Sequence, residues 1–297
     1  VVASDVLRRI DVPYWFDTNV YGTLLDFFAK NYYVEYKGAF SPETRTTAGC
    51  LYPSTEFPTL FVFPYDWRQS NADSADDLAD YIGCVRRFHP DRPITVIAHS
   101  MGGLIVRHYI LDHPGHGLGK VITVGTPWLG SPKALNTLET GQMLEWLEHQ
   151  FVIRTGVLKE LVEFFPGAHE LLPSSAYYNL GGTPVNVMQP SLTEMSPTDS
   201  LNFAETVQLL NTKFPRSQPG TATATFHSAQ QDNWGDGQSS VPIYYIIYGE
   251  GNSPDTIEQV VYYNGLYRWI DSYIESEYVG VKKLGLGDGT VPLLSST

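Results

Sequence analysis

Apolar residues follow two different periods in the first half of the chain. The runs at 59–63, 94–98 and 120–125 are short, apolar and rich in β-branched or aromatic residues, which is typical of buried strands. Between them, residues 74–88 and 101–112 place apolar side chains three or four positions apart, the spacing of an amphipathic helix. This alternation of strand and helix predicts a mostly parallel central sheet with helices on both faces.

The pattern changes in residues 131–240. The stretch that extends to about residue 165 is amphipathic and predicts helix, whereas residues 171–200 are rich in Pro, Gly and Ser and predict irregular structure. An excursion of this length between strands indicates an inserted cap, because ordinary connections are short.

The strand pattern resumes at residues 241–249, and Asn264-Gly265 between two aromatic runs predicts a hairpin. We therefore expect two parts in an α/β fold. Residues 1–130 and 241–297 would form the core, and residues 131–240 would form the cap.

The charge of the chain disfavours two classes of partner. Its formal net charge is −13 over 297 residues, which disfavours binding to nucleic acid and to anionic membrane surfaces. Any contact with lipid would have to come from apolar side chains. Charged residues make up 17%, and 19 tyrosines and 20 prolines accompany them, a composition that favours an extracellular or secreted protein over a cytoplasmic one. No run of about 18 apolar residues is present to span a membrane.

The cysteines and histidines indicate no metal centre. The eight histidines are scattered, and neither Cys-x-x-Cys nor His-Glu-x-x-His occurs, so no metal or other cofactor is implied. Cys50 and Cys84 are the two cysteines. They either form one disulfide in an oxidising compartment or are two small buried side chains, and the residues leave both alternatives open.

One stretch carries a clear chemical pattern, "VIAHSMGGLIVRHYI" at 96–110. A serine between small residues, after a buried strand and before a helix, is typical of the nucleophile elbow. Small residues at Ala98 and Gly102 would avoid collisions across the tight turn. Ser100 is thus the candidate nucleophile, and the backbone N–H of Met101 at the helix start is a candidate oxyanion donor. The alternative is an ordinary structural turn.

A serine nucleophile needs a base and a carboxylate that orients it. In this arrangement the order along the chain is Ser, then Asp or Glu, then His. Asp288 lies late in the chain, in the glycine turn "GDGTVP", and is the candidate acid. A solvent-exposed turn is the alternative.

Four motifs in order, with a fifth in the cap, resemble the lecithin:cholesterol acyltransferase family, which includes lysosomal-type phospholipases and bacterial relatives. These motifs are "FPYDWR" (63–68), "AHSMGG" (98–103), "GTPWLG" (125–130), "LLPS" (171–174) and "GDGTVP" (287–292).

The resemblance implies an α/β-hydrolase fold with a cap, Ser100 as nucleophile and Asp288 as triad acid. The reaction would transfer an acyl group from a lipid ester to water or to an alcohol, with transient contact at a membrane or lipoprotein surface. Asp66 and Arg68 could pair, and Trp67 and Trp128 are candidate walls of the substrate site. A helix around 141–165 is a candidate interfacial element, and packing on the core is its alternative.

The chain departs from the family pattern at both ends. No histidine follows Asp288, so the triad histidine is not identifiable, and no apolar strand with a glycine loop precedes residue 4 to supply a second oxyanion donor. We therefore expect a trimmed chain. His149, His169 and His227 in the expected cap are the remaining candidates for the base. Two other functions stay open: a general carboxylesterase or lipase, and a non-catalytic hydrolase-fold module that binds lipid or protein. The acyl donor, the acceptor and the oligomeric state do not follow from the sequence.

Overall fold

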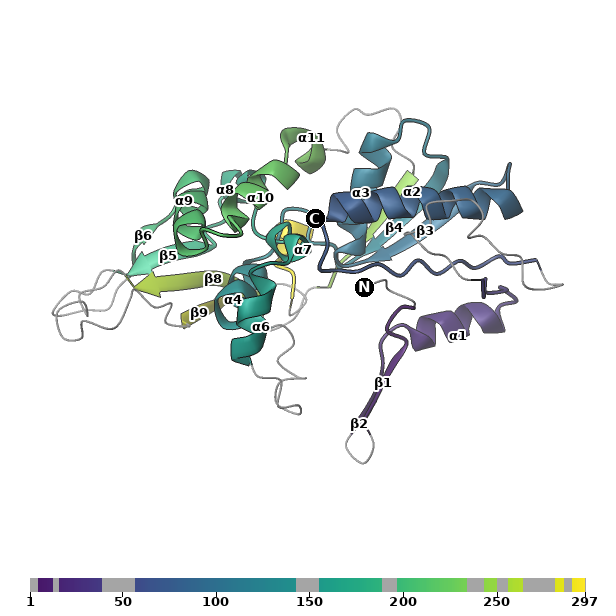
Figure 1. Cartoon of the computed structure of the whole chain (residues 1–297), viewed down its shortest axis with the longest axis horizontal. Coiled ribbons are helices and arrows are strands. Elements are labelled where there is room, and N and C mark those ends of the chain that lie inside the picture. Colours follow the sequence, from purple (N-terminus) through teal and green to yellow (C-terminus); the bar gives the residue numbers. More distant parts are fainter. Residues whose placement is uncertain are drawn as a thin grey trace. The chain divides into compact units, whose positions relative to one another are not determined.

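The structure is a computed structural model that describes residues 5–12, 16–38, 57–142, 155–188, 197–233, 243–249, 256–263, 281–285 and 290–296. The chain divides into two compact units, whose helices and strands are labelled in Figure 1. The first consists of Val1–Asp66 with Ala72–Ile94, and the second of Trp67–Asn71 with Thr95–Thr297.

The described residues of the first unit form β1 (Arg9–Val12), β2 (Phe16–Asn19), α1 (Gly22–Lys30) and most of α2 (Asn71–Phe88). Strands β1 and β2 pair antiparallel. The four α2 residues that the helical spacing placed on one face are all buried: Leu78, Tyr81, Ile82 and Val85. Cys84 on the same helix is disulfide-bonded, and Cys50 lies outside the described residues.

Residues 59–63 do not form the expected buried strand. They contain one isolated parallel bridge, between Leu60 and Glu35. The N–H of Tyr36 donates to the Leu60 carbonyl at 2.8 Å. Pro58 and Pro64 flank the run, and neither has an N–H to extend the pairing. The apolar character is used instead in an aromatic cluster, where Phe61 packs on Tyr36 and Phe88.

The sheet expected from the alternating pattern lies in the second unit. Its strands are ordered β3 (Ile94–His99), β4 (Leu118–Val124), β7 (Ile243–Ile247), and β4 and β7 are parallel. Helix α3 (Gly102–Asp112) follows β3 directly. Its expected core residues are at most 4% exposed: Leu104, Ile105, Tyr109 and Ile110. The structure confirms this part of the prediction. The prediction was possible because the apolar periodicity is strong on both sides of Ser100.

A second sheet has the order β6-β5-β8-β9. Its strands are β5 (Val185–Met188), β6 (Pro197–Ser200), β8 (Thr256–Tyr263) and β9 (Val281–Gly285). Strands β5 and β8 are parallel, and the other two pairings are antiparallel. The sheet thus joins two strands from the expected cap to two from the expected core range, and the domain division stays a prediction. Asn264-Gly265 lies outside the described residues.

Besides α3, eight helices are described in the second unit. They are α4 (Pro132–Thr140), α6 (Thr155–Val162), α7 (Pro166–His169), α8 (Ser175–Asn179), α9 (Phe203–Lys213), α10 (Pro219–Phe226), α11 (Ala229–Asp232) and α12 (Leu293–Ser296), as far as the structure describes the chain. The expectation of irregular structure at 171–200 is therefore wrong in part, since α8, β5 and β6 lie within it. Ser174 caps α8 by accepting from the Tyr177 N–H at 3.3 Å, so the same Ser that indicated a turn begins a helix.

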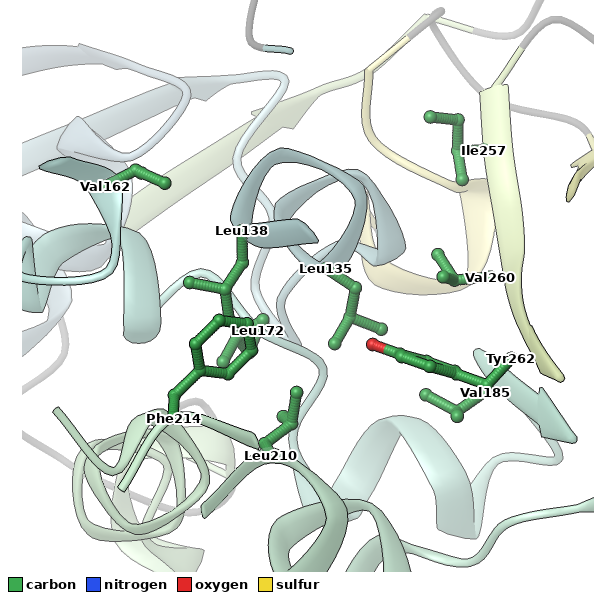
Figure 2. Packing of buried hydrophobic residues seen from close by; sticks show 10 residues of the cluster. All are labelled: Leu135, Leu138, Val162, Leu172, Val185, Leu210, Phe214, Ile257, Val260 and Tyr262. Carbon is green, nitrogen blue, oxygen red and sulfur yellow. The ribbon is translucent and has the colours of Figure 1, made fainter. Parts of the chain in front are cut away.

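The main apolar cluster of the second unit holds helices α4, α6 and α9 against β5 and β8 (Figure 2). Leu135 and Leu138 of α4 lie at its centre, with Val260 of β8 and Leu210 of α9 around them. Each of these side chains is at most 2% exposed, and full burial of one such side chain stabilises a fold by about 1.5–3 kcal/mol. This cluster holds α4 in place, and α4 follows the loop that comes after β4.

Candidate active site

Ser100 lies in a strained turn between β3 and α3. Its φ is +52°, and only Tyr32 and Gln218 share a positive φ among the described non-glycine residues. Such a backbone is costly for an L-residue and is typical of the nucleophile elbow. The Ser100 N–H donates to the Val124 carbonyl at 2.8 Å, so the end of β4 holds the turn.

The loop after β4 holds the same turn from the other side. The Thr126 hydroxyl donates to the Ser100 carbonyl at 3.0 Å. A β-carbon on Gly103 would lie 2.1 Å from the Thr126 Oγ1, so this close approach requires glycine. The sequence interpretation assigned the space requirement to Ala98 and Gly102, and did not single out Gly103.

Met101 begins the helix that follows the turn. Its side chain is buried, and its carbonyl accepts from the Leu104 N–H at 3.0 Å. The Met101 N–H finds no hydrogen-bond acceptor among the described residues. It is one of the first N–H groups of α3, which lie at the positive end of the helix dipole. Among the described residues this N–H is thus unpaired, and its role as an oxyanion donor stays a prediction.

Residues 290–296 lie against the loop that follows β4. The Trp128 N–H donates to the Ser295 carbonyl at 2.9 Å, and the Leu129 N–H donates to the Ser295 Oγ at 3.1 Å. The Ser131 hydroxyl donates to the Thr290 carbonyl at 2.9 Å. Asp288 itself lies outside the described residues, two positions before Thr290.

The "LLPS" motif contacts the same loop. The Ser131 N–H donates to the Leu171 carbonyl at 2.8 Å, and the Ser174 N–H donates to the Leu129 carbonyl at 2.9 Å. Gly130 has a φ of +83°, and a β-carbon there would lie 2.2 Å from the Leu172 carbonyl oxygen. Two motifs that are 41 to 49 positions apart in the sequence are thus joined backbone to backbone.

Trp67 packs against Phe165, a residue within the range expected to form the cap. Its ring meets that of Phe165 edge to face at a centroid distance of 5.3 Å. The neighbouring Arg68 carbonyl accepts from the Gly167 N–H at 3.4 Å. The Asn71 N–H donates to the Glu170 Oε2 at 2.6 Å. The expected Asp66–Arg68 ion pair stays a prediction.

A buried charged cluster that contacts the Trp128 carbonyl was not predicted from the sequence. Arg107 is fully buried, and its Nη1 donates to the Trp128 carbonyl at 2.9 Å. The Asp232 carboxylate lies 3.7 Å from the same nitrogen and 2.8 Å from the Nδ1 of His227. Burial lowers the pKa of Arg107 to about 10, although Asp232 opposes this effect. The sequence held one signal for this cluster. Arg107 lies three positions after Leu104, which places a charged residue on the apolar face of α3.

The histidines whose hydrogen bonds the structure gives are bonded to groups other than the Ser100 hydroxyl. His169 Nε2 donates to the Glu163 carbonyl at 2.8 Å, and His227 Nε2 donates to the Glu170 carbonyl at 2.9 Å. His108 contacts Asp112 and Gln231. Within the described ranges no histidine is hydrogen-bonded to the Ser100 hydroxyl. His149 lies outside them, so the base stays unidentified.

The part of the chain that the structure describes holds neither a cluster of metal ligands nor a membrane-spanning helix. No group of three or more His, Cys, Asp or Glu side chains is placed to hold a metal ion there. No helix among those residues is both long and apolar enough to cross a membrane.

Comparison with known proteins gives consistent matches. The family model described as Lecithin:cholesterol acyltransferase matches residues 56–297. A phospholipase A(1) of Arabidopsis thaliana, LCAT3, is 33% identical over 131 residues, which cover 42% of this chain and 29% of that protein. A phosphatidylcholine-sterol acyltransferase of Mus musculus is 33% identical over 89 residues, or 28% of this chain and 20% of that protein. The matched regions thus span less than a third of these relatives.

A solved structure confirms the expected α/β-hydrolase fold. The crystal structure of the Tle4-Tli4 complex superposes with a TM-score of 0.56 at 18% sequence identity, covering 78% of this chain and 57% of that one. At this identity the likeness concerns the fold alone.

Proposed function

Because this chain belongs to the lecithin:cholesterol acyltransferase family, we propose that it is a serine-dependent acyl hydrolase or acyltransferase that acts on lipid esters. The observation that supports this most directly is the positive φ of Ser100 at the strand–helix turn. That backbone exposes the Oγ of a serine above the sheet while the helix start lies beneath it.

In the proposed reaction the Ser100 Oγ attacks the ester carbonyl carbon, and a base takes the hydroxyl proton. The Met101 N–H donates to the oxyanion of the tetrahedral intermediate. Collapse of the intermediate breaks the ester C–O bond, and the base returns the proton to the leaving alcohol. Water or a second alcohol then attacks the acyl-enzyme and releases Ser100. The base and the second oxyanion donor are not assigned.

Asp288 is the proposed acid that orients the base. Its neighbour Thr290 is held by the Ser131 hydroxyl, and Ser295 is held by the N–H groups of Trp128 and Leu129. The segment of residues 290–296, which begins two positions after Asp288, is therefore tied to the loop that also holds the Ser100 carbonyl. Trp128 on this loop and Trp67 beside Phe165 are the proposed walls of the substrate site.

The proposed substrate implies contact with a lipid surface. Val157, Leu161 and Phe164 are 50–52% exposed, and their spacing of four and three places them on one side of α6 and its continuation. Contact of this kind would be apolar, because a chain of net charge −13 is repelled by anionic headgroups. The Cys84 disulfide and the composition support a secreted protein, since disulfides persist in oxidising compartments.

Fluorophosphonate labelling of the 297-residue chain tests the nucleophile, with the adduct located by mass spectrometry. We expect one adduct at Ser100 and none in Ser100→Ala, a result that would mean that a histidine of this chain supplies the base and would overturn the expectation of a trimmed chain. The Asp288→Asn variant should label much more slowly, because removal of a triad member costs several orders of magnitude.

The result also separates the alternative functions. A folded chain that labels at Ser100 and cleaves phosphatidylcholine in vesicles supports the proposal. Cleavage of short-chain p-nitrophenyl esters and of triacylglycerol without phosphatidylcholine would favour a general carboxylesterase or lipase. A folded chain that binds vesicles and does not label would favour a binding module, which the lack of a described histidine at Ser100 would then explain.

A further inference from the structure

Arg107 is a charge that the fold buries at a high energetic cost. Its side chain is fully buried on α3, seven residues after Ser100. Its Nε and Nη2 have no hydrogen-bond partner among the described residues, and its Nη1 donates to the Trp128 carbonyl. An arginine buried with most of its five donors unused stabilises a fold poorly, and an apolar side chain of similar volume often serves stability better. A structural role alone therefore accounts badly for this residue.

The surroundings of Arg107 hold its guanidinium in one place. Its central carbon lies 5.7 Å from the ring centroid of Trp128 and 5.8 Å from that of Phe226, both within the range of cation–π attraction. Asp232 lies 3.7 Å from Nη1, and His227 holds Asp232 in turn. The guanidinium is thus fixed by α10 and α11 on one side and by Trp128 on the other.

The Trp128 backbone connects Arg107 to the segment after Asp288. The carbonyl of Trp128 accepts from Arg107 at 2.9 Å, while the N–H of the same residue donates to the Ser295 carbonyl at 2.9 Å. Both peptide groups of Trp128 are therefore held, one from the Ser100 helix and one from α12. A change at Arg107 would remove the bond that joins α3 to the Trp128 carbonyl, while Thr126 would still donate to the Ser100 carbonyl.

We propose that Arg107 is a positioning residue for the reaction at Ser100. It fixes the loop of residues 126–129 to α3, so that the segment of residues 290–296 and the Trp128 ring keep their places relative to Ser100. Arg107 itself contacts no substrate. This inference rests on the proposed function of Ser100 and adds a residue to it.

Three variants of the network and one matched control test the inference. Arg107→Met removes the charge with similar length, Arg107→Lys keeps a charge with a different donor geometry, and Asp232→Asn removes the partner. Glu139→Gln is the control, because Glu139 forms a buried ion pair with Lys213 at 2.9 Å away from Ser100 and Trp128. The readouts are the labelling rate at Ser100, hydrogen exchange of the Trp128 and Leu129 amides, and the melting temperature.

We expect Arg107→Met to slow labelling about tenfold or more, since small misplacements in an active site have large effects on rate. Exchange at Trp128 and Leu129 should rise, and Arg107→Lys should recover part of both. Asp232→Asn should lie between Arg107→Lys and Arg107→Met. Glu139→Gln should lower the melting temperature and leave labelling and these two amides unchanged.

Each outcome bears on one proposal at a time. Unchanged exchange at Trp128 and Leu129 in Arg107→Met overturns the positioning role, whether or not the wild type labels. The positioning role is also overturned if the wild type labels at Ser100 and Arg107→Met labels at the same rate although exchange at Trp128 and Leu129 is raised. The loop would then not position the reaction. Failure of the folded wild type to label counts against the proposed function of Ser100 and leaves the exchange result to decide on Arg107.

Discussion

The side chain of Thr126 fills the space that a β-carbon on Gly103 would need. The two would lie 2.1 Å apart at the Thr126 Oγ1, and that oxygen already donates to the Ser100 carbonyl. The turn that carries the candidate nucleophile is thus shaped by a residue two positions beyond the end of β4. This contact makes Gly103 a sensitive position for both stability and reactivity.

Gly103→Ala should destabilise the protein by about 1–3 kcal/mol, the usual cost of overpacking. It should also slow labelling at Ser100, because Thr126 can move only by breaking its hydrogen bond to the turn. Denaturant unfolding and the labelling rate measure the two effects. The double variant Gly103→Ala/Thr126→Ala should be less destabilised than the sum of the single changes. Strict additivity would contradict the contact.

Gly130→Ala should be more damaging than a change at another left-handed glycine. Gly130 has a φ of +83° and Leu172 backbone at 2.2 Å from its β-position, whereas Gly181 has a φ of +91° and nothing within 4 Å. Gly181→Ala should therefore cost only the backbone preference, about 1–2 kcal/mol, and Gly130→Ala about 1–3 kcal/mol more. Thermal unfolding compares them. Equal losses would mean that "LLPS" can shift away from the loop at no cost.

Ser295→Ala should reduce both stability and reactivity. Ser295 is 1% exposed, and loss of its Oγ leaves the Leu129 N–H without that acceptor, which costs about 1–3 kcal/mol. Ser200→Ala is the matched control, because its hydroxyl donates to the Asn186 side chain at 2.6 Å in the second sheet. Only Ser295→Ala should slow labelling at Ser100. A similar slowing in Ser200→Ala would point to a global effect.

Tyr262→Phe should destabilise the protein more than Tyr178→Phe. The Tyr262 hydroxyl donates to the buried Glu139 carboxylate at 2.8 Å, and a hydrogen bond to a charged group contributes about 1.5–3 kcal/mol. The Tyr178 hydroxyl donates to Thr206 at 2.8 Å, a neutral pair that contributes about 0.5–1.5 kcal/mol. Urea unfolding at neutral pH tests the order, and the reverse order would show that Lys213 alone suffices for Glu139.

His169 should make the protein less stable in mild acid. Burial lowers its pKa from the ordinary value of 6.5, and the hydrogen bond to the Glu163 carbonyl opposes this only in part. Below about pH 6.5 the unfolded chain therefore binds a proton at His169 more readily than the folded chain. The contribution of His169 is full above that pH and is lost as the pH falls. Unfolding free energies of wild type and His169→Gln, compared from about pH 7.5 to about pH 5.5, should show a smaller decrease in the variant.

The elements around Ser100 could be predicted because their signals are local. Strands β3 and β4 and helix α3 begin and end within about two residues of the expected positions, since β-branched runs and helical spacing alternate without ambiguity. The tight turn at Ser100 could be predicted for the same reason, because its small neighbours Ala98 and Gly102 are visible in the sequence.

The support of the site could not be predicted because it depends on contacts distant in the chain. Nothing near Arg107 in the sequence indicates that its partner is Asp232, which lies 125 positions later. The run at 59–63 has the composition of a strand, yet composition supplies no neighbouring strand, and the flanking prolines limit the pairing to Leu60. The short helices α7 and α8 were missed because prolines and serines begin helices as well as turns.

The order of strands in the second sheet has a consequence for the synthesis of the protein. Val185 of β5 pairs with Val260 of β8, so the hairpin of β5 and β6 leaves the ribosome long before its parallel neighbour. At about 5–20 residues per second, the 75 residues between these partners take about 4–15 s to translate. During that interval β5 presents an unpaired edge, a template for association with other chains. The second sheet can therefore be completed only late in synthesis, once β8 has been made.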